Sequence, residues 1–122
     1  MKRLIFKSCY LVPIIDGLKT STIRRRCNLR EGDALRLNNG YSRSMAFGEA
    51  VVVSNAEIGV HELTDELAQA DGIADAPALI AALAQLYPDA LSLRLIHFRL
   101  TRVVATHPLV VAHRRATRKY RT

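Results

Sequence analysis

Three side chains near the start of the chain have types and a spacing that could support nucleophilic chemistry. They are Lys19, Thr22 and Arg24, and the segment 20–24 that carries two of them is β-branched and alternating, which favours a strand. Successive side chains on a strand point to opposite faces, so Thr20, Thr22 and Arg24 share one face. Lys19 precedes the strand, where a bend in the backbone can turn its amine toward the same face.

Together these groups could cleave an acyl bond. A lysine in a partly dry pocket loses its proton more readily, and its neutral amine can then accept a proton from a hydroxyl. An activated threonine can attack an acyl carbon, and an arginine nearby can hold a phosphate or a base edge. The same residues are often found at a solvated sheet edge, and their spacing alone favours that interpretation over catalysis.

The elements before this segment and after it are expected to be short. The sequence predicts a strand over 4–6, then an apolar helix over 9–16 that Ser8 can cap and Gly17 ends. Beyond the reactive segment, the patterns predict a turn at 30–33, a strand over 34–37, a hairpin turn at Asn39-Gly40 and a long strand whose most apolar section is 50–53.

Two helices and a last strand complete the pattern. The first helix is expected over 63–70 and ends at Asp71-Gly72, and the second over 76–86 is capped by Asp75. The final strand, 93–104, places Ile96, Phe98 and Leu100 on one face and His97, Arg99 and Thr101 on the other. The sequence therefore predicts an α+β domain with a curved sheet and two helices inserted before its last strand.

The chain is strongly basic, with a formal net charge of +7 from 18 Lys and Arg against 11 Asp and Glu. Such an excess attracts polyanions such as nucleic acid, although surface charge also serves solubility. Arg24, Arg25 and Arg26 are consecutive, and the segment 112–122 is basic without apolar periodicity. We expect that segment to be a mobile arm beyond a domain over 1–111.

Several function classes find no support in the sequence. Cys9 and Cys27 are far apart, and the four histidines show no ligand spacing, so neither a disulfide scaffold nor a metal site is expected, and no cofactor is implied. We see no secretion signal and no apolar run of the roughly 20 residues that a membrane span needs. A cytoplasmic monomer is the default expectation.

The segment 17–24, Gly-Leu-Lys-Thr-Ser-Thr-Ile-Arg, resembles the G-x-K-T-x-T-x-R signature of ASCH domains, the activating-signal-cointegrator homology family. Further matches follow in the family's order, over roughly residues 4–100. They are Glu31-Gly32-Asp33 with Leu35, Leu63-Thr64, Asp71-Gly72, Leu79, Leu83, Tyr87-Pro88 and Ile96-His97-Phe98.

The resemblance implies a PUA-like curved or closed β-barrel with a short N-terminal helix, a cleft beside the two-helix insert, and RNA as a partner. The short bacterial members most similar to this chain are amidohydrolases that deacetylate N(4)-acetylcytidine. Their proposed residues correspond to Lys19, Thr22 and Asp71, where the family has glutamate at the third position. Glu62 or Glu66 could replace Asp71 only if the insert packs differently.

The hydrolytic hypothesis assigns a role to each group. Lys19 is the general base, Thr22 is the nucleophile or positions a water, and Asp71 orients Lys19 or protonates the leaving amine. Arg24 holds the sugar or phosphate, and backbone amides near Thr20 and Ser21 could stabilise the oxyanion.

Two alternatives remain open. A non-catalytic RNA-binding module would use the same cleft, with Arg24, Arg25 and Arg26 on the RNA backbone and the basic arm adding affinity. More remotely, Tyr41 and His97 could join the cleft residues in a ribonuclease, and Tyr41 is also a candidate substrate contact.

Overall fold

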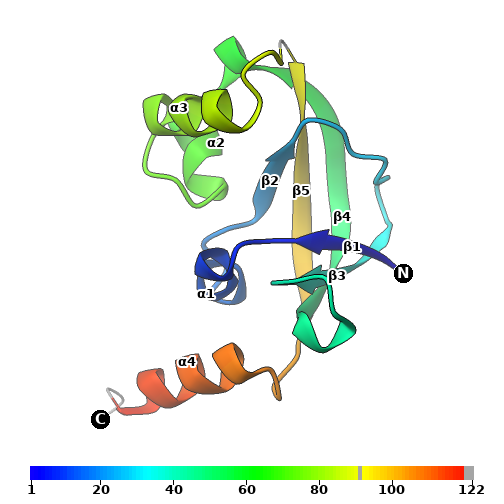
Figure 1. Ribbon diagram of the computed structural model, residues 1–122, viewed down its shortest axis with the longest axis vertical. Helices are drawn as coiled ribbons and strands as arrows, with labels where there is room; N and C mark the ends of the chain where they lie inside the picture. Colours follow the sequence, from blue (N-terminus) through cyan, green and yellow to red (C-terminus); the bar gives the residue numbers. More distant parts are fainter. Residues whose placement is uncertain (91, 120–122) are drawn as a thin grey trace.

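One five-stranded sheet, in the order β1-β3-β4-β5-β2, forms the frame of the protein (Figure 1). The computed structural model describes residues 1–90 and 92–119. The strands are β1 (Lys2–Ile5), β2 (Ser21–Arg24), β3 (Ala34–Asn38), β4 (Ala46–Gly59) and β5 (Ser92–Val103). β1 pairs with β3 in parallel, and the other three pairings are antiparallel.

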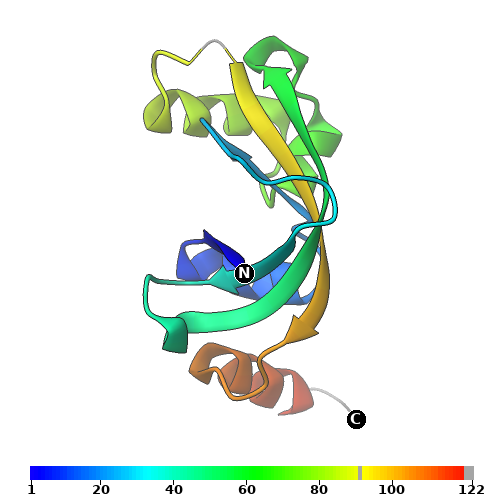
Figure 2. The same ribbon diagram turned by 90° about the vertical axis from the view of Figure 1, so that its right-hand side faces the viewer.

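The sheet curls into a half-barrel, which confirms the predicted curved α+β fold (Figure 2). The pairing of β4 with β5 shifts register between Glu49 and Ala50 and between Val52 and Ser54, and such bulges bend a strand and increase its twist. The edge strands β1 and β2 do not pair. Instead, Nη2 of Arg24 on β2 donates to the carbonyl oxygen of Ile5 on β1 over 2.8 Å. This side chain bridges the open seam of the barrel.

Short helices occupy the connections. The α-helices are α1 (Leu11–Ile15), α2 (Asp65–Ala70), α3 (Ala76–Leu86) and α4 (Pro108–Lys119), and the 3-10 turns are η1 (Ser8–Tyr10), η2 (Arg43–Met45) and η3 (Val60–Glu62). α2 and α3 form the predicted insert before β5. They begin as expected for capped helices, because Thr64 and Asp75 accept backbone N–H bonds from Leu67 and Ala78.

Two hydrophobic clusters hold these elements together. One lies between the sheet, α1 and the start of α4, and its most buried members include Leu11, Leu35 and Phe47. The other seats the helical insert on β2 and β5 and includes Leu79 and Leu93. The insert and α1 therefore rest on different parts of one curled sheet, with the seam between them.

Two local predictions differ from the structure. Ser8 does not cap the first helix, because it is the first residue of η1, which precedes α1. The N-cap residue of η1 is Lys7, which makes no side-chain cap bond. Asn39-Gly40 is not a two-residue hairpin turn, since β4 begins only at Ala46 after η2. The buried amide of Asn38 donates to the carbonyl oxygens of Gly40 and Ser42 and so holds this longer loop.

The basic C-terminal segment also differs from expectation. The sequence predicts a mobile arm from residue 112 and no helix there, whereas α4 runs from Pro108 to Lys119 and spans the expected boundary at 111/112. The large apolar residues of the helix, 109–111, all precede residue 112, and Val110 is the one fully buried residue in the described part of the helix. Long-range contacts hold the helix instead. The rings of His107 and His113 bond to Asn39 and Asp16 over 3.0 and 2.9 Å.

Candidate functional site

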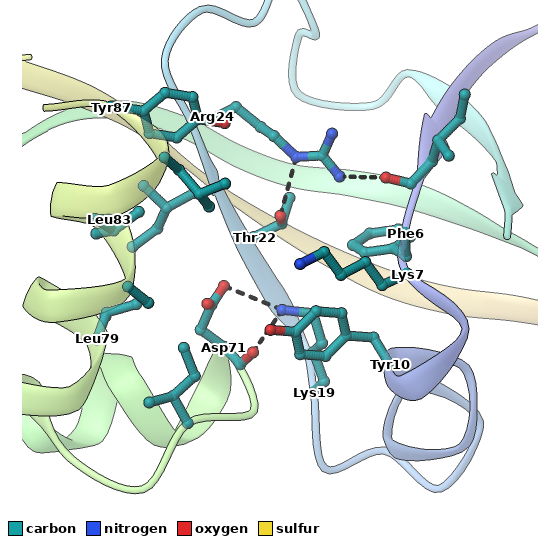
Figure 3. Close-up of a pocket in the computed structure, with 15 residues that line it drawn as sticks. Phe6, Lys7, Tyr10, Lys19, Thr22, Arg24, Asp71, Leu79, Leu83 and Tyr87 are labelled. Atoms are coloured by element: carbon teal, nitrogen blue, oxygen red, sulfur yellow. Dashed lines mark hydrogen bonds and ion pairs between the residues drawn. The ribbon is translucent and has the colours of Figure 1, made fainter. Parts of the chain in front are cut away.

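A cavity of about 230 Å³ opens between α1 and the helical insert, beside β2 (Figure 3). Its walls come from the end of β1 and the following loop, η1, the loop before β2, β2 itself, the loop after α2, and α3. The lining residues are Ile5, Phe6, Lys7, Tyr10, Lys19, Thr22, Ile23, Arg24, Asp71, Ile73, Leu79, Ala82, Leu83, Leu86 and Tyr87. Most of this wall is apolar, and a few polar groups converge on it, which is the usual make-up of a small-molecule site.

Lys19 and Asp71 form a buried ion pair in the cavity wall. Nζ of Lys19 lies 3.1 Å from Oδ1 of Asp71 and also donates to the backbone carbonyl oxygen of Asp71. The two residues are only 3% and 7% exposed. Asp71 thus reaches the lysine amine despite having a shorter side chain than glutamate, whereas Glu62 and Glu66 do not line the cavity.

Two glycines place this pair. Gly17 at φ 77° ends α1, and Gly72 at φ 88° follows the C-cap residue of α2, which is Asp71 itself. The backbone N–H of Thr20 then donates to the carbonyl oxygen of Ala70 over 2.8 Å. This bond joins the segment after α1 to the end of α2, so that Lys19, just before Thr20, faces Asp71, just after Ala70.

Burial shifts both members of the pair toward their neutral forms. It lowers the pKa of the Lys19 amine below its ordinary value, against the opposing attraction of Asp71. It also raises the pKa of the Asp71 carboxyl, against the opposing effect of the Lys19 ammonium. Both shifts narrow the gap between the pKa of the amine and that of the carboxyl, which makes transfer of a proton from nitrogen to oxygen easier than between exposed groups.

Thr22 and Arg24 line the same cavity from β2, as strand alternation predicts. Thr22 is 6% exposed, and its Oγ1 accepts a hydrogen bond of 3.2 Å from Nε of Arg24. With its oxygen engaged as acceptor, the hydroxyl keeps its own hydrogen for a ligand. The Arg24 guanidinium also lies 5.2 Å from the centre of the Phe6 ring, so several contacts fix its orientation.

The sequence did not indicate the aromatic wall. Phe6, Tyr10 and Tyr87 all line the cavity, and Nζ of Lys19 lies 4.6 Å from the centre of the Tyr10 ring. Burial raises the pKa of the Tyr10 hydroxyl, so the ring is neutral at ordinary pH. The exposed Lys7 extends toward the middle of the pocket from the loop after β1 (Figure 3). These residues lie in predicted core or linker positions, and only tertiary structure brings them to the site.

Other predicted site residues lie outside the cavity. Thr20 is exposed, and the exposed Arg25 and Arg26 follow β2. Ser21 is completely buried, and its hydroxyl has no hydrogen-bond partner among the described residues. Tyr41 is 78% exposed, and neither it nor His97 lines the cavity. The structure therefore brings together Lys19, Thr22, Arg24 and Asp71 and separates them from the rest.

Residues 1–90 and 92–119 contain neither a metal-binding cluster nor a membrane-spanning helix. That part of the chain holds no cluster of three or more His, Cys, Asp or Glu side chains arranged to bind a metal ion. None of the helices in it combines the length and the apolar character needed to cross a membrane. The polar side chains that line the site include the Lys19 amine, the Asp71 carboxyl, the Thr22 hydroxyl and the Arg24 guanidinium.

The fold and the site define a small α+β half-barrel protein. Its pocket lies at the seam between β1 and β2 and presents a few polar groups on a mostly apolar wall. Solved structures share that fold. The ASCH protein of Zymomonas mobilis superposes with a TM-score of 0.65 at 13% identity, covering 93% of this chain and 78% of that one. The ASCH domain of Lactobacillus crispatus gives 0.63 at 11% identity, covering 83% and 80%.

A third structure, an Enterococcus faecalis protein of the DUF984 family, gives a TM-score of 0.64 at 12% identity over 88% of this chain and 85% of that one. No family model and no curated protein matches the sequence. The chain has the ASCH-domain fold, as the motif over residues 17–24 predicted.

Proposed function

We propose that this protein is an amidohydrolase that removes the acetyl group from N(4)-acetylcytidine, with Lys19, Asp71 and Thr22 as its reactive groups. The observation that carries the proposal is the buried Lys19–Asp71 pair in the wall of a pocket that also holds the Thr22 hydroxyl. A buried ion pair rarely stabilises a fold more than apolar residues of similar volume would. This comparison favours a functional role for the Lys19–Asp71 pair over a purely stabilising one.

The size and lining of the cavity suit a modified base. At about 230 Å³ the cavity is below the roughly 300–1,000 Å³ typical of sites for drug-sized ligands. Unstacked bases are held by stacking on aromatic rings and by hydrogen bonds to their edges. Phe6, Tyr10 and Tyr87 provide rings, and Thr22 and Arg24 provide donors. A pyrimidine with a small acyl group matches this combination.

The resting contacts favour a water molecule as the attacking group. In the described residues no hydrogen bond joins the Lys19 amine to the Thr22 hydroxyl, since Lys19 bonds to Asp71 and Thr22 to Arg24. In the proposed reaction neutral Lys19 takes a proton from water as the water oxygen bonds to the acetyl carbon. The Thr22 hydroxyl donates to the acetyl oxygen, where negative charge develops.

The second half of the reaction returns the pair to the neutral form from which the water attack began. The bond between the acetyl carbon and the exocyclic nitrogen breaks, and this nitrogen receives a proton from the neutral carboxyl of Asp71. Acetic acid and cytidine leave. The Lys19 ammonium then passes its proton back to the Asp71 carboxylate, along the 3.1 Å contact between Nζ and Oδ1.

Acetate release from N(4)-acetylcytidine tests the proposal. Wild-type protein is expected to turn over repeatedly, and Lys19→Ala and Thr22→Ala are expected to lose about 100-fold or more in kcat/KM. Thr101→Ala is the matched control, because Thr101 is an exposed strand threonine that does not line the cavity. Equal activity in the wild type and in both pocket variants would remove the proposal.

A non-catalytic RNA-binding module is the second candidate, and charge favours it. A free nucleoside carries no phosphate, so a nucleoside enzyme gains little from a net charge of +7 or from Arg114, Arg115 and Arg118 on the exposed face of α4. Steep weakening of RNA binding with salt, in a protein without acetate release, would favour this candidate. Because Tyr41 and His97 lie outside the cavity, no observation favours a ribonuclease.

A further inference from the structure

A second hollow lies on the other side of Arg24. It has a volume of about 540 Å³ and is formed by β1 and by the chain that follows β2. We call it the cationic hollow. Its lining residues are Lys2, Arg3, Leu4, Arg24, Arg26, Cys27, Asn28 and Leu29. It therefore lies along the same unpaired seam between the edge strands β1 and β2 that the cavity adjoins.

The charge of this hollow is of one sign. Four of its eight lining residues are basic and none is acidic. Lys2 is neutralised by Asp33 at 2.9 Å, and one Arg3 donor binds the carbonyl oxygen of Tyr41. Within the described residues Arg26 makes no hydrogen bond to another side chain or to the backbone, so its donors face solvent. Such a lining fits an anion better than a neutral ligand.

Arg24 is the shared wall of the two spaces. Its bonds to Thr22 and to the Ile5 carbonyl oxygen use two of its five donors, which leaves others for a ligand. A nucleotide has the same order of parts, with a base, then a sugar, then a phosphate. A base in the cavity would thus place its own phosphate beside Arg24 and the next one beside Arg26 or Arg3.

We propose that the cationic hollow binds the phosphodiester groups of a single-stranded RNA whose modified base occupies the cavity. The hollow is lined by several cations, which exceeds what one terminal phosphate requires. The inference rests on the proposed function, because the base in the cavity is the acetylated cytosine. It makes the RNA strand, and not the free nucleoside, the preferred substrate.

The test compares three substrates: N(4)-acetylcytidine, its 5′-monophosphate, and an RNA pentanucleotide with the modified base in the centre. Wild-type protein is expected to prefer the pentanucleotide in kcat/KM. Arg26→Gln and Arg3→Gln are each expected to reduce that preference about tenfold, which is the loss of one charge-assisted hydrogen bond. Arg99→Gln is the control, because Arg99 is exposed and lines neither space.

Three outcomes would overturn the inference. The first is an equal kcat/KM for the pentanucleotide and the nucleoside. The second is a preference for the pentanucleotide that neither Arg26→Gln nor Arg3→Gln reduces. The third is a kcat/KM for the 5′-monophosphate as high as that for the pentanucleotide. If no substrate is deacetylated, the proposed function fails. Binding of an unmodified labelled pentanucleotide then tests RNA binding by the cationic hollow independently of catalysis. Arg26→Gln should then weaken binding about tenfold and reduce the slope of log K against log salt by about 0.7. Equal binding by the wild type and this variant would overturn the inference.

Discussion

The amine of Lys19 binds the carboxylate and the backbone carbonyl oxygen of Asp71, a residue 52 positions further along the chain. Asp71 directly follows α2, and Lys19 lies four residues after α1; a glycine with positive φ, Gly72 or Gly17, lies beside each. The pair lies against the ring of Tyr10 and is almost completely buried. Two properties of this pair can be measured: its contribution to the free energy of unfolding and its part in the proposed reaction.

Stability measurements on Lys19→Met, Asp71→Leu and the double variant test the pair itself. Each single change leaves a buried charge without its partner and is expected to lower the free energy of unfolding by about 3 kcal/mol. The double variant replaces the pair with apolar side chains, so its loss in free energy of unfolding should be smaller than the sum of the two single losses by about 2 kcal/mol or more. Urea denaturation measures all four proteins. Additive losses would contradict the direct coupling of Lys19 and Asp71.

The pH dependence of stability should reveal the lowered pKa of Lys19. The folded protein releases this proton at a lower pH than the unfolded chain, whose lysine keeps the ordinary pKa of 10.5. In that window the unfolded state binds more protons, so the free energy of unfolding rises with pH. Relative to Lys19→Met, the wild type should gain stability from neutral pH toward 10.5. A flat or falling difference between the two denaturation curves would show that the pKa is not lowered.

Substitutions at Thr22 distinguish the two ways in which its hydroxyl could act. If Thr22 donates to the acetyl oxygen while water attacks, Thr22→Ser should retain most of kcat and Thr22→Val should lose about 100-fold. No acetylated protein should accumulate during turnover. Mass spectrometry of the quenched reaction checks this point. An acetyl group on the peptide that contains Thr22 would establish attack by the threonine instead.

The arginines of α4 should contribute to RNA binding through charge alone. Arg114, Arg115 and Arg118 are exposed on a helix that Val110, His107 and His113 anchor. Replacing all three arginines with Gln should reduce the salt slope of binding to a single-stranded RNA by about 2, from about 0.7 for each lost phosphate contact. Circular dichroism should show an unchanged helix content. A slope equal to that of the wild type would place α4 outside the RNA interface.

The polar part of the site could be predicted from sequence because local rules determine it. Gly17 ends a helix, β-branched residues follow, and alternation then places Thr22 and Arg24 on one face. Asp71-Gly72 is likewise a local helix-end signal. That the two helix exits meet follows only from the resemblance to ASCH domains, since nothing in the periodicity of either segment joins them.

The rest of the site depends on tertiary contacts that no local pattern contains. Tyr10 and Lys7 follow β1, which pairs in parallel with β3 at the edge of the sheet opposite β2. They reach the cavity because the curl of the sheet brings these two edge strands close together. The bridge from Arg24 to Ile5 exists for the same reason. α4 was missed because its anchors, Asn39 and Asp16, lie in distant loops.

The most direct test of the central claim is the release of acetate from N(4)-acetylcytidine by the wild-type protein and by Lys19→Met, a variant of nearly equal volume. Both proteins should first be shown to be folded under the assay conditions. The account predicts saturable, repeated turnover by the wild type and a rate at least about 100-fold lower for the variant. A wild-type rate no higher than the uncatalysed reaction, or equal rates for the two proteins, would contradict it.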